Sequence, residues 1–399
     1  MSTRACPQRV GILTGGGDCP GLNAVIRAVT QSLLRQCGAE VIGIEDGFAG
    51  LLCEPARARR LDWDAVSGIL LLGGTILGSS NRANPLASAQ ATALALANVR
   101  RLGLDALVVI GGDGSMTIAH GLAQQGLAIV GVPKTIDNDL YGCERSFGFD
   151  TAVATVTEAL ERIQTTAHSH HRVMIVETMG RWAGWIALES GLAGAADAIL
   201  LPELDYDLPT LARHCQARLQ RERYSVICIG EGAKAQGGAP TLQTSPALPA
   251  DGHPVPRLGG VAHQLSAQLQ PLLDAEVRAT VLGHVQRGGS PTPSARVLAT
   301  LYGNQAAQLL LQGQFGCMVT LSGGQLGHIA LAEVAQQQSP AAGIRYHKAK
   351  QYICTKYVNQ KIEFRKHFGF DVLHADVMVQ CAYDLYITRQ RVDPNLHFQ

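Results

Sequence analysis

The first 338 residues of this 399-residue chain contain only two lysines, Lys134 and Lys234. Charged residues make up 16% of the sequence, and the formal net charge is +1. A chain with so little excess charge has no overall basic field for a nucleic acid or an anionic membrane surface. Any binding of phosphate groups must therefore depend on a local site.

The ten cysteines are scattered along the chain, and no two of them form a CxxC pair. Such spacing indicates neither a zinc site nor a readable disulfide framework. No run reaches the roughly 18 apolar residues of a membrane span, and the first residues lack the apolar core of a signal peptide. We therefore expect a reduced, cytoplasmic protein with no membrane partner.

Apolar residues make up 46% of the sequence, which is ample for a buried core, and the length suggests two lobes. Short apolar runs alternate with segments of helical periodicity, such as residues 87–102 and 208–222. This alternation predicts an α/β fold with two Rossmann-like α/β/α lobes and largely parallel sheets. The strands are expected at residues 10–13, 41–44, 106–110, 128–132, 173–176, 225–229 and 317–321.

Ligands of such folds bind beyond the carboxyl ends of the strands, and glycine-rich segments lie there. TGGGDCPGLN (residues 14–23) lets main-chain amides approach an anion at a helix N-terminus, although a tight structural turn explains it as well. IGGDGS (residues 110–115) places Asp113 among glycines. A carboxylate there can bind Mg²⁺ beside phosphate groups, and the alternative is an aspartate that caps the next helix.

A third segment, PKTIDND (residues 133–139), carries two carboxylates, Asp137 and Asp139. Two residues apart on an extended segment, both can face one cleft. One could accept a proton while the other helps to hold a metal ion. Aspartate pairs of this spacing are common in surface turns, so the functional interpretation depends on the preceding apolar strand and on the adjacent Thr135 and Lys134.

Two later segments also follow apolar strands. MGRWAGW (residues 179–185) places Arg181 at a strand end, where the alternative is a surface arginine at a helix start. IGEGAK (residues 229–234) places Glu231 there, and a carboxylate suits sugar hydroxyl groups but could equally be a helix N-terminal acid.

The segment RATVLGHVQRGG (residues 278–289) carries Arg278, His284 and Arg287. Arginine forks suit phosphate monoesters, and His284 can donate to the same oxygens. A lone histidine is usually structural, but one between two arginines and beside a Gly-Gly pair favours phosphate binding.

Together these segments resemble the phosphofructokinase family, in family order and nearly continuously over residues 9–337. The resemblance implies transfer of a phosphoryl group from ATP or pyrophosphate to the 1-hydroxyl of fructose 6-phosphate, with Mg²⁺ as cofactor. The segments that carry it are TGGGDCPGLN, GGTILGSSNR, IGGDGS, VPKTIDND, GFDTA, SHHRVMIVETMGRWAGW, IGEG and RATVLGHVQRGGSP.

The resemblance also implies the roles of single residues. Asp137 matches the general base that takes the proton of the 1-hydroxyl, with Thr135 and Arg181 beside it in catalysis. Asp113 matches the Mg²⁺ ligand. The positions that match contacts to the phosphate donor are Gly17, Arg82, Asp113, Gly114, Ser115 and Lys134.

The sugar phosphate is expected to contact a second set of residues. Arg172 and Arg278 match side chains that reach the 6-phosphate pocket from a neighbouring subunit, so the resemblance implies a homotetramer. The full set that matches substrate contacts is Thr135, Asp137, Asp139, Arg172, Met179, Gly180, Arg181, Glu231, Arg278, His284 and Arg287.

The family's two-lobe plan implies a donor lobe formed by residues 1–149 and 286–337 and a fructose 6-phosphate lobe formed by residues 150–285. Residues 338–399 differ from both in composition. Residues 339–399 hold five lysines and nine of the seventeen Phe and Tyr residues of the chain. We expect an atypical C-terminal tail, either a true extension or a fusion or frame-shift remnant.

Donor choice in the family tracks positions 114 and 134. An aspartate at 114 would repel the α-phosphate of ATP, whereas Gly114 leaves that space open. Lys134 is typical of pyrophosphate users, so the Gly114/Lys134 pair resembles the mixed-substrate group. ATP is the expected donor. The alternatives are a pyrophosphate-dependent phosphofructokinase and a catalytically inactive family member.

The sequence departs from the family pattern at the effector site of its regulated bacterial members. Arg27 matches the first arginine of that site, but Gln31 stands where the second belongs. Asp197 replaces the usual glutamate. Regulation by ADP or phosphoenolpyruvate is therefore not implied.

Overall fold

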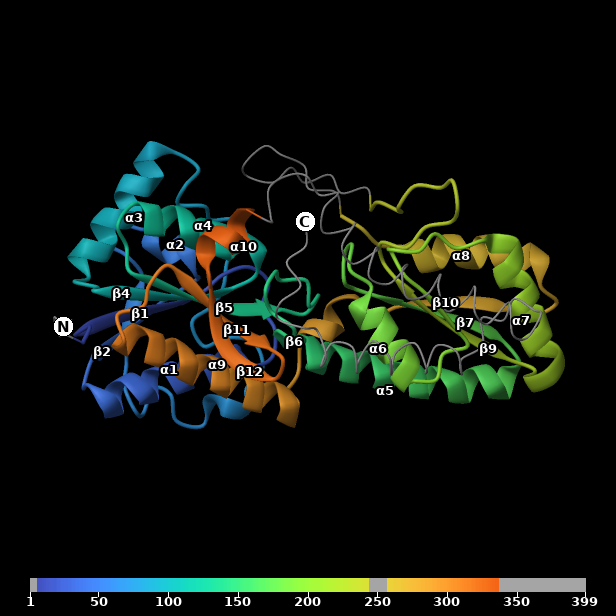
Figure 1. The fold of residues 1–399 in the computed structure, drawn as a ribbon. Coiled ribbons are helices and arrows are strands. Elements are labelled where there is room, and N and C mark those ends of the chain that lie inside the picture. Colours follow the sequence, from blue (N-terminus) through green and yellow to red (C-terminus); the bar gives the residue numbers. More distant parts are fainter. Residues whose placement is uncertain (1–5, 244–256, 337–399) are drawn as a thin grey trace. The chain divides into compact units, whose positions relative to one another are not determined.

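The computed structural model describes residues 6–243 and 257–336 (Figure 1). The expected tail lies outside the described residues. The chain divides into two compact units. Of the described residues, the first unit contains 6–151 and 287–336, and the second contains 152–243 and 257–286.

The first unit is built on an eight-stranded sheet, ordered β12-β11-β5-β4-β1-β2-β3, with β6 paired to β5. All neighbours are parallel except the edge pairs β11–β12 and β2–β3. The strands are β1 (Arg9–Thr14), β2 (Glu40–Ile44), β3 (Ala58–Leu61), β4 (Ala106–Gly111), β5 (Ile129–Thr135), β6 (Phe147–Gly148), β11 (Cys317–Ser322) and β12 (Gln325–Ala330).

Helices cover both faces of this sheet (Figure 1). On one face α1 and α9 pack so closely that a Cβ at Gly303 would lie 2.7 Å from the Cβ of Ala28. On the other face α2, α3, α4 and α10 bury apolar side chains such as Val99, Met116 and Leu331. The helices are α1 (Leu22–Gln36), α2 (Phe48–Leu51), α3 (Ala89–Arg101), α4 (Asp113–Gln124), α9 (Pro293–Leu311) and α10 (Leu331–Gln336), with a 3-10 turn at Ile69–Leu71.

The second unit has a parallel four-stranded sheet, ordered β10-β7-β9-β8. Helices α7 and α8 pack on its strands through a core that includes Val173, Ile227 and Leu265. Asp207 caps α7 by accepting a hydrogen bond from the Thr210 amide at 2.9 Å. The elements are β7 (Val173–Thr178), α6 (Trp185–Ala193), β8 (Ala198–Leu200), α7 (Leu208–Glu222), β9 (Ser225–Gly230), α8 (Val261–Leu269) and β10 (Val277–Val281), with α5 (Phe149–His170) leading in from the first unit.

The expectation of an α/β fold with largely parallel sheets is confirmed, and each of the seven expected strands is present. The two helical segments at 87–102 and 208–222 correspond to α3 and α7. The sequence did not indicate β3, β6, β8, β10 or β12. Four of these are edge strands, and the two-residue β6 pairs only with β5.

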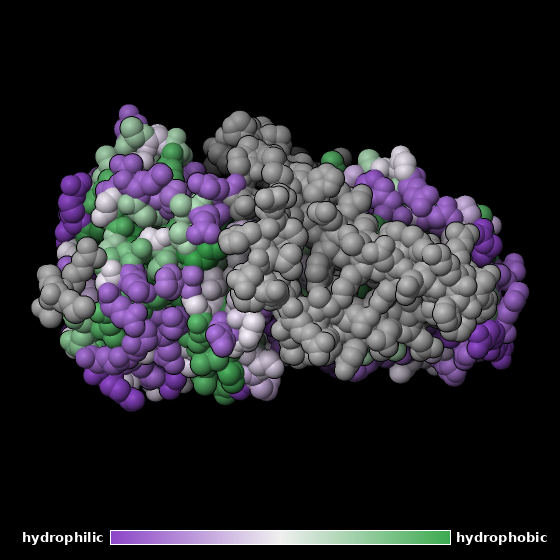
Figure 2. Space-filling view, viewed as in Figure 1, coloured by the Kyte–Doolittle hydropathy of each residue, from purple (hydrophilic) through white to green (hydrophobic). Residues whose placement is uncertain are grey.

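The described surface is mixed in character. On the face shown in Figure 2, hydrophilic side chains surround smaller hydrophobic patches in the first unit. Among the described residues, no helix is long and apolar enough to cross a membrane.

Candidate active site

Three of the predicted motifs meet at one end of the first-unit sheet. Strands β1, β4 and β5 are neighbours and run parallel, so their carboxyl ends lie side by side. The glycine loop follows β1, IGGDGS follows β4, and TIDND follows β5. This end of the sheet is where parallel α/β folds bind their ligands.

The glycine loop is packed tightly against the start of α4. The Gly15 amide donates to the Ile110 carbonyl at 2.9 Å. A Cβ at Gly15 would lie 2.5 Å from Oγ of Ser115, and a Cβ at Gly111 would lie 2.3 Å from the Ser115 Cβ. A side chain at Gly111 would therefore collide with Ser115, and one at Gly15 would require the Ser115 hydroxyl to move. The buried Ser115 fills the space between the two loops, where the resemblance predicted a donor contact.

The loop is also tied to the GSSNR segment that contains Arg82. The Ser79 hydroxyl donates to the Gly16 carbonyl at 2.5 Å, and the Gly16 amide donates to the Ser80 carbonyl at 3.0 Å. Arg82 itself is exposed. The role of Ser79 as a brace of the glycine loop was not predicted. The signal available in the sequence was the position of this serine, three residues before the predicted Arg82.

Helix α4 begins at Asp113, and Gly112 occupies the N-cap position. Asp113 is thus a first-turn residue and not the cap, so the capping alternative does not describe it. Gly114 is exposed, and a Cβ built there meets nothing within 4 Å. The first amides of a helix lack intrahelical acceptors, so this turn presents a carboxylate and main-chain donors to an open space.

Lys134 is buried, with 4% of its surface exposed. Its ammonium group donates a hydrogen bond to the Gly17 carbonyl. Burial lowers the pKa of Lys134 below its usual value, and the charge of Arg287 lowers it further. The thiol of Cys19 is fully buried near this lysine, and burial raises its pKa to about 12. Cys19 therefore acts as a neutral packing group.

Asp137 lies in a loop after β5 that is held by its own side chains. The Asp137 amide donates to Oγ1 of Thr135 at 3.0 Å. Asn138 adopts a left-handed backbone conformation (φ 53°), and its Oδ1 accepts from the Ser146 amide at 2.9 Å. Such conformations persist only where the surroundings hold them. Asp137 is 6% exposed, and the less buried Asp139 contacts the Thr135 hydroxyl at 3.4 Å.

Arg287 lies against the glycine loop. One guanidinium nitrogen donates to the Asp18 carbonyl at 3.2 Å, and the same nitrogen would lie 3.0 Å from a Cβ at Gly17. Arg287, which is expected to bind the sugar 6-phosphate, is thus a direct neighbour of Gly17, which is expected to bind the donor.

In the second unit, the carboxyl ends of β7, β9 and β10 gather the predicted sugar contacts. The Arg181 amide donates to Oε1 of Glu231 at 2.9 Å, and the Glu231 amide donates to the Thr178 carbonyl at 2.9 Å. Arg181 is held at φ 52°. A Cβ at Gly232 would lie 2.2 Å from the Arg181 carbonyl oxygen. The Arg181 loop and the Glu231 turn therefore form one interlocked element.

Met179 and His284 belong to the same end of this sheet. Gln286, which is fully buried, accepts a hydrogen bond from the Met179 amide at 3.2 Å. Its amide nitrogen donates to the Gly283 carbonyl at 3.0 Å. Gln286 therefore links the loop after β7 to the turn that carries the exposed His284. No sequence signal singled out this glutamine.

Arg172 and Arg278 lie at the opposite, amino end of the same strands. Arg172 directly precedes β7, and Arg278 is the second residue of β10. Both guanidinium groups form ion pairs with Glu276. The structure thus separates these two arginines from Met179, Gly180, Arg181, Glu231 and His284 within one chain.

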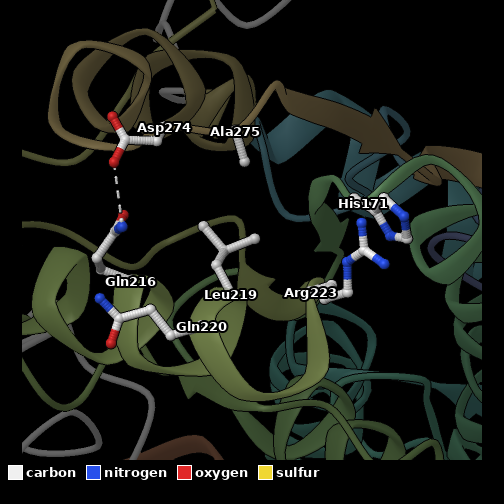
Figure 3. A pocket seen from close by; sticks show the side chains of 7 residues that line it. All are labelled: His171, Gln216, Leu219, Gln220, Arg223, Asp274 and Ala275. Carbon is white, nitrogen blue, oxygen red and sulfur yellow. Dashed lines mark hydrogen bonds between the residues drawn. The ribbon is translucent and has the colours of Figure 1, made fainter.

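A polar pocket of about 240 Å³ also opens at this amino end (Figure 3). In it, the Gln216 side chain donates to Asp274 at 3.3 Å. None of the residues predicted to bind donor or sugar lines this pocket. Its lining is formed by His171, Gln216, Leu219, Gln220, Arg223, Asp274 and Ala275.

Asp197, which stands in place of the effector-site glutamate, is engaged within its own unit. Its carboxylate accepts from the Val226 amide at 2.8 Å and pairs with Arg218 at 2.8 Å. These contacts join β8, β9 and α7.

Comparison with known proteins identifies the family of this chain. A family model described as phosphofructokinase matches residues 9–310, well over half of the chain. The chain belongs to the phosphofructokinase family. It is 46% identical over 341 residues to ATP-dependent 6-phosphofructokinase 2 of Clostridium perfringens, an alignment that covers 82% of this chain and 92% of that one. It is 48% identical to ATP-dependent 6-phosphofructokinase 2 of Streptomyces coelicolor, covering 83% and 95%.

This phosphofructokinase also resembles a relative named for another donor. It is 45% identical to a pyrophosphate–fructose 6-phosphate 1-phosphotransferase of Amycolatopsis methanolica, covering 86% of this chain and 99% of that one. Among solved structures, phosphofructokinase of Pichia pastoris in the T-state matches with a TM-score of 0.75 and 29% identity. That match covers 88% of this chain but spans only 37% of the yeast chain.

Proposed function

We propose that this chain is an ATP-dependent 6-phosphofructokinase, which forms fructose 1,6-bisphosphate from fructose 6-phosphate in glycolysis. The observation that carries the proposal is the convergence of the glycine loop, the α4 N-terminus and the buried Asp137 at one end of the first-unit sheet. The relatives named above, which align over nearly their whole length, support the same reaction.

The chemistry assigned to these residues needs positioning and charge neutralisation more than covalent participation. Asp137 accepts the proton of the sugar 1-hydroxyl as the new oxygen–phosphorus bond forms. Thr135 fixes the Asp137 loop through its hydroxyl. The main-chain amides of the glycine loop and of the first turn of α4 bind the donor phosphates, beside Arg82 and Lys134.

Magnesium is the proposed cofactor, and Asp113 is its proposed protein ligand. The described residues contain no group of three or more His, Cys, Asp or Glu side chains that could hold a metal ion. A single first-turn carboxylate beside an anion-binding loop fits Mg²⁺, which usually combines one or two carboxylates with substrate phosphates and water. Bound there, the ion would neutralise charge on the donor phosphates.

ATP is favoured over pyrophosphate because of the open space at Gly114. An aspartate there would extend into the space proposed for the α-phosphate, and Gly114 leaves it clear. Lys134 supports pyrophosphate as the second candidate, as does the similarity to the Amycolatopsis enzyme. Lys134 donates to the Gly17 carbonyl, so it also has a loop-holding role that either donor can use.

The active enzyme is proposed to be a homotetramer with shared active sites. The six residues of β7, at about 3.3 Å each, separate Arg172 from the Arg181 loop by roughly 20 Å. One sugar phosphate cannot contact both ends of the same strand. If Arg172 and Arg278 bind the 6-phosphate together with His284 and Arg287, they do so at the site of another chain.

A product assay tests the proposed reaction. The full chain is incubated with Mg²⁺, ATP and fructose 6-phosphate, and the products are quantified. We expect fructose 1,6-bisphosphate and ADP in equal amounts. Fructose 1-phosphate, whose 1-hydroxyl is blocked, serves as the control and should give no product. Intact, assembled protein that forms no fructose 1,6-bisphosphate would support the inactive-member alternative.

Co-expression tests the shared site separately. Asp137→Asn removes the base from every site, and Arg172→Ala removes a 6-phosphate contact from every neighbouring site. In mixed oligomers, an Asp137→Asn chain can lend its Arg172 to a chain whose Asp137 is intact. The mixture should therefore recover part of the activity.

The matched control co-expresses Asp137→Asn chains with Asp139→Asn chains. Both changes affect the same side of the site, so the mixture should recover no activity. Co-assembled Asp137→Asn and Arg172→Ala chains that stay as inactive as the separate variants would show that Arg172 acts within its own chain.

A cytoplasmic location is proposed on two grounds. The reaction consumes ATP and a glycolytic sugar phosphate. The eight cysteines of the described part of the chain are free thiols, as is typical of a reducing compartment.

A further inference from the structure

Glu276 lies between the two arginines that are separated from the rest of the sugar site. Its Oε2 pairs with Nε of Arg172, and its Oε1 pairs with Nη2 of Arg278. One carboxylate therefore uses both oxygens to join side chains from two neighbouring strands.

The backbone fixes this arrangement. β7 and β10 run parallel with Val173 opposite Val277, and the Val173 amide donates to the Glu276 carbonyl at 3.0 Å. Arg172 is consequently the neighbour of Glu276 across the ladder. Side chains two apart on a strand share a face, so Glu276 and Arg278 project from the same side of β10. Register and alternation together place all three side chains in contact.

The physical role of such a carboxylate follows from charge. Two guanidinium groups that must bind one phosphate dianion repel each other while the phosphate is absent. A carboxylate between them offsets this repulsion and restricts their rotamers. Each guanidinium uses one N–H group for Glu276 and keeps its other N–H groups for a second acceptor.

Stability alone gives a weak reason for these contacts. The side chains of Arg172, Glu276 and Arg278 are 32%, 37% and 60% exposed, and ion pairs at such exposure contribute little to folding because water screens them. Desolvation acts to raise the pKa of Glu276, but Arg172 and Arg278 together lower it. The group is therefore ionised at neutral pH.

We propose that Glu276 is a positioning residue that holds Arg172 and Arg278 as one preformed phosphate-binding unit for the sugar 6-phosphate of a neighbouring subunit. The proposal rests on the proposed function, in which these arginines serve a shared active site. Glu276 itself does not touch the substrate. Its contribution is to reduce the freedom that the arginines lose when the phosphate binds.

The variant Glu276→Gln tests this role, because it keeps the size of the side chain and removes its charge. We expect the KM for fructose 6-phosphate to rise about tenfold, the effect of weakening one charge-assisted contact. The kcat at saturating sugar phosphate and the KM for ATP should stay within about twofold of wild type, since the donor site and Asp137 are unchanged.

Glu158→Gln is the matched control. It removes an exposed ion pair with Arg162, of 2.6 Å, from α5 of the same unit, and it should leave every kinetic constant unchanged. If Glu276→Gln fails to assemble, Glu276→Asp replaces it. The charge is then kept on a side chain too short to join both arginines, and the same selective rise in KM is expected.

A double-mutant cycle separates positioning from a direct effect. In an Arg172→Ala background, adding Glu276→Gln should raise the KM for fructose 6-phosphate by less than about threefold, because one of its two partners is already missing. A full tenfold effect in that background would overturn the proposal. So would a KM for Glu276→Gln equal to or below wild type, or a lowered thermal midpoint with an unchanged KM.

The single variant Arg172→Ala distinguishes the positioning role of Glu276 from the shared-site proposal on which that role depends. If Arg172→Ala raises the KM for fructose 6-phosphate and Glu276→Gln does not, only the positioning role of Glu276 fails. If Arg172→Ala itself leaves that KM unchanged, the shared-site assignment fails and the role of Glu276 fails with it.

Discussion

The ammonium group of Lys134, near the end of β5, donates a hydrogen bond to the main-chain carbonyl of Gly17 in the loop after β1. This contact connects two of the three motifs at the proposed donor site. Because Lys134 is buried, its loss would leave the Gly17 carbonyl without this donor and the loop less fixed.

Lys134→Met should therefore weaken donor binding. We expect the KM for ATP to rise about tenfold or more, the effect of losing a charged hydrogen bond, with little change in the KM for fructose 6-phosphate. Initial rates at varied ATP measure this. Lys234→Met is the control, because Lys234 pairs with Asp205 at 2.7 Å in the second unit. Equal effects of the two variants on the KM for ATP would contradict the role of Lys134.

Gly114→Asp should change donor choice. A Cβ at this position meets nothing within 4 Å, so the variant should fold normally. The added carboxylate should repel the α-phosphate and lower kcat/KM for ATP by about a hundredfold or more. Pyrophosphate, which lacks that phosphate, should lose less. Gly114→Ala adds the Cβ without the charge and should have a small effect. If Gly114→Asp lowers kcat/KM equally for ATP and for pyrophosphate, position 114 does not select the donor.

Asp137→Asn should remove the general base and keep the shape of the loop. We expect kcat to fall by about 10²–10⁴ with a modest change in the KM for fructose 6-phosphate. Asp62→Asn, at an exposed position in the first unit, should retain wild-type kcat. Near-normal turnover by a folded Asp137→Asn enzyme would exclude Asp137 as the base.

Glu203 should make stability depend on pH. It is fully buried, its Oε1 accepts from the Gly184 amide at 2.8 Å, and burial raises its pKa. Above the unfolded pKa of about 4.3, the unfolded chain releases this proton before the folded protein does. Folding is therefore progressively disfavoured as the pH rises through the folded pKa.

Thermal unfolding of Glu203→Gln and of wild type at several pH values measures the pH-dependent contribution of Glu203 to stability, because Gln cannot ionise. The midpoint of the variant relative to wild type should become more positive as the pH rises above the unfolded pKa of about 4.3. The absolute offset is not diagnostic, because the amide changes local hydrogen bonding. A difference that stays constant with pH would show that Glu203 is ionised in the folded protein.

Much of the fold follows from apolar patterning, and its failures share a physical cause. Central strands such as β4 and β9 are buried on both faces and read as continuous apolar runs. The edge strands β3 (ARRL) and β12 (QLGHIA) are partly exposed and carry polar residues. The apolar pattern of β10 is interrupted by the charged Arg278.

The residues of the candidate site also fall into those that the sequence reveals and those that it does not. Glycines and carboxylates directly after buried strands can be found from sequence, because sheet topology brings strand ends together. Ser79, Gln286 and Glu276 act through contacts between segments distant in sequence or on neighbouring strands. Two of them had a usable signal. Ser79 stands three residues before the predicted Arg82, and Glu276 stands two residues before Arg278 and so shares its face of a strand.

The most direct test of ATP as the donor is kcat/KM of the wild-type enzyme for ATP and for pyrophosphate, measured side by side at saturating fructose 6-phosphate and Mg²⁺. The open space at Gly114 predicts a value at least about tenfold higher for ATP, equivalent to 1.4 kcal/mol or more in favour of the ATP transition state. A higher value for pyrophosphate would contradict the account and make Lys134 the deciding residue.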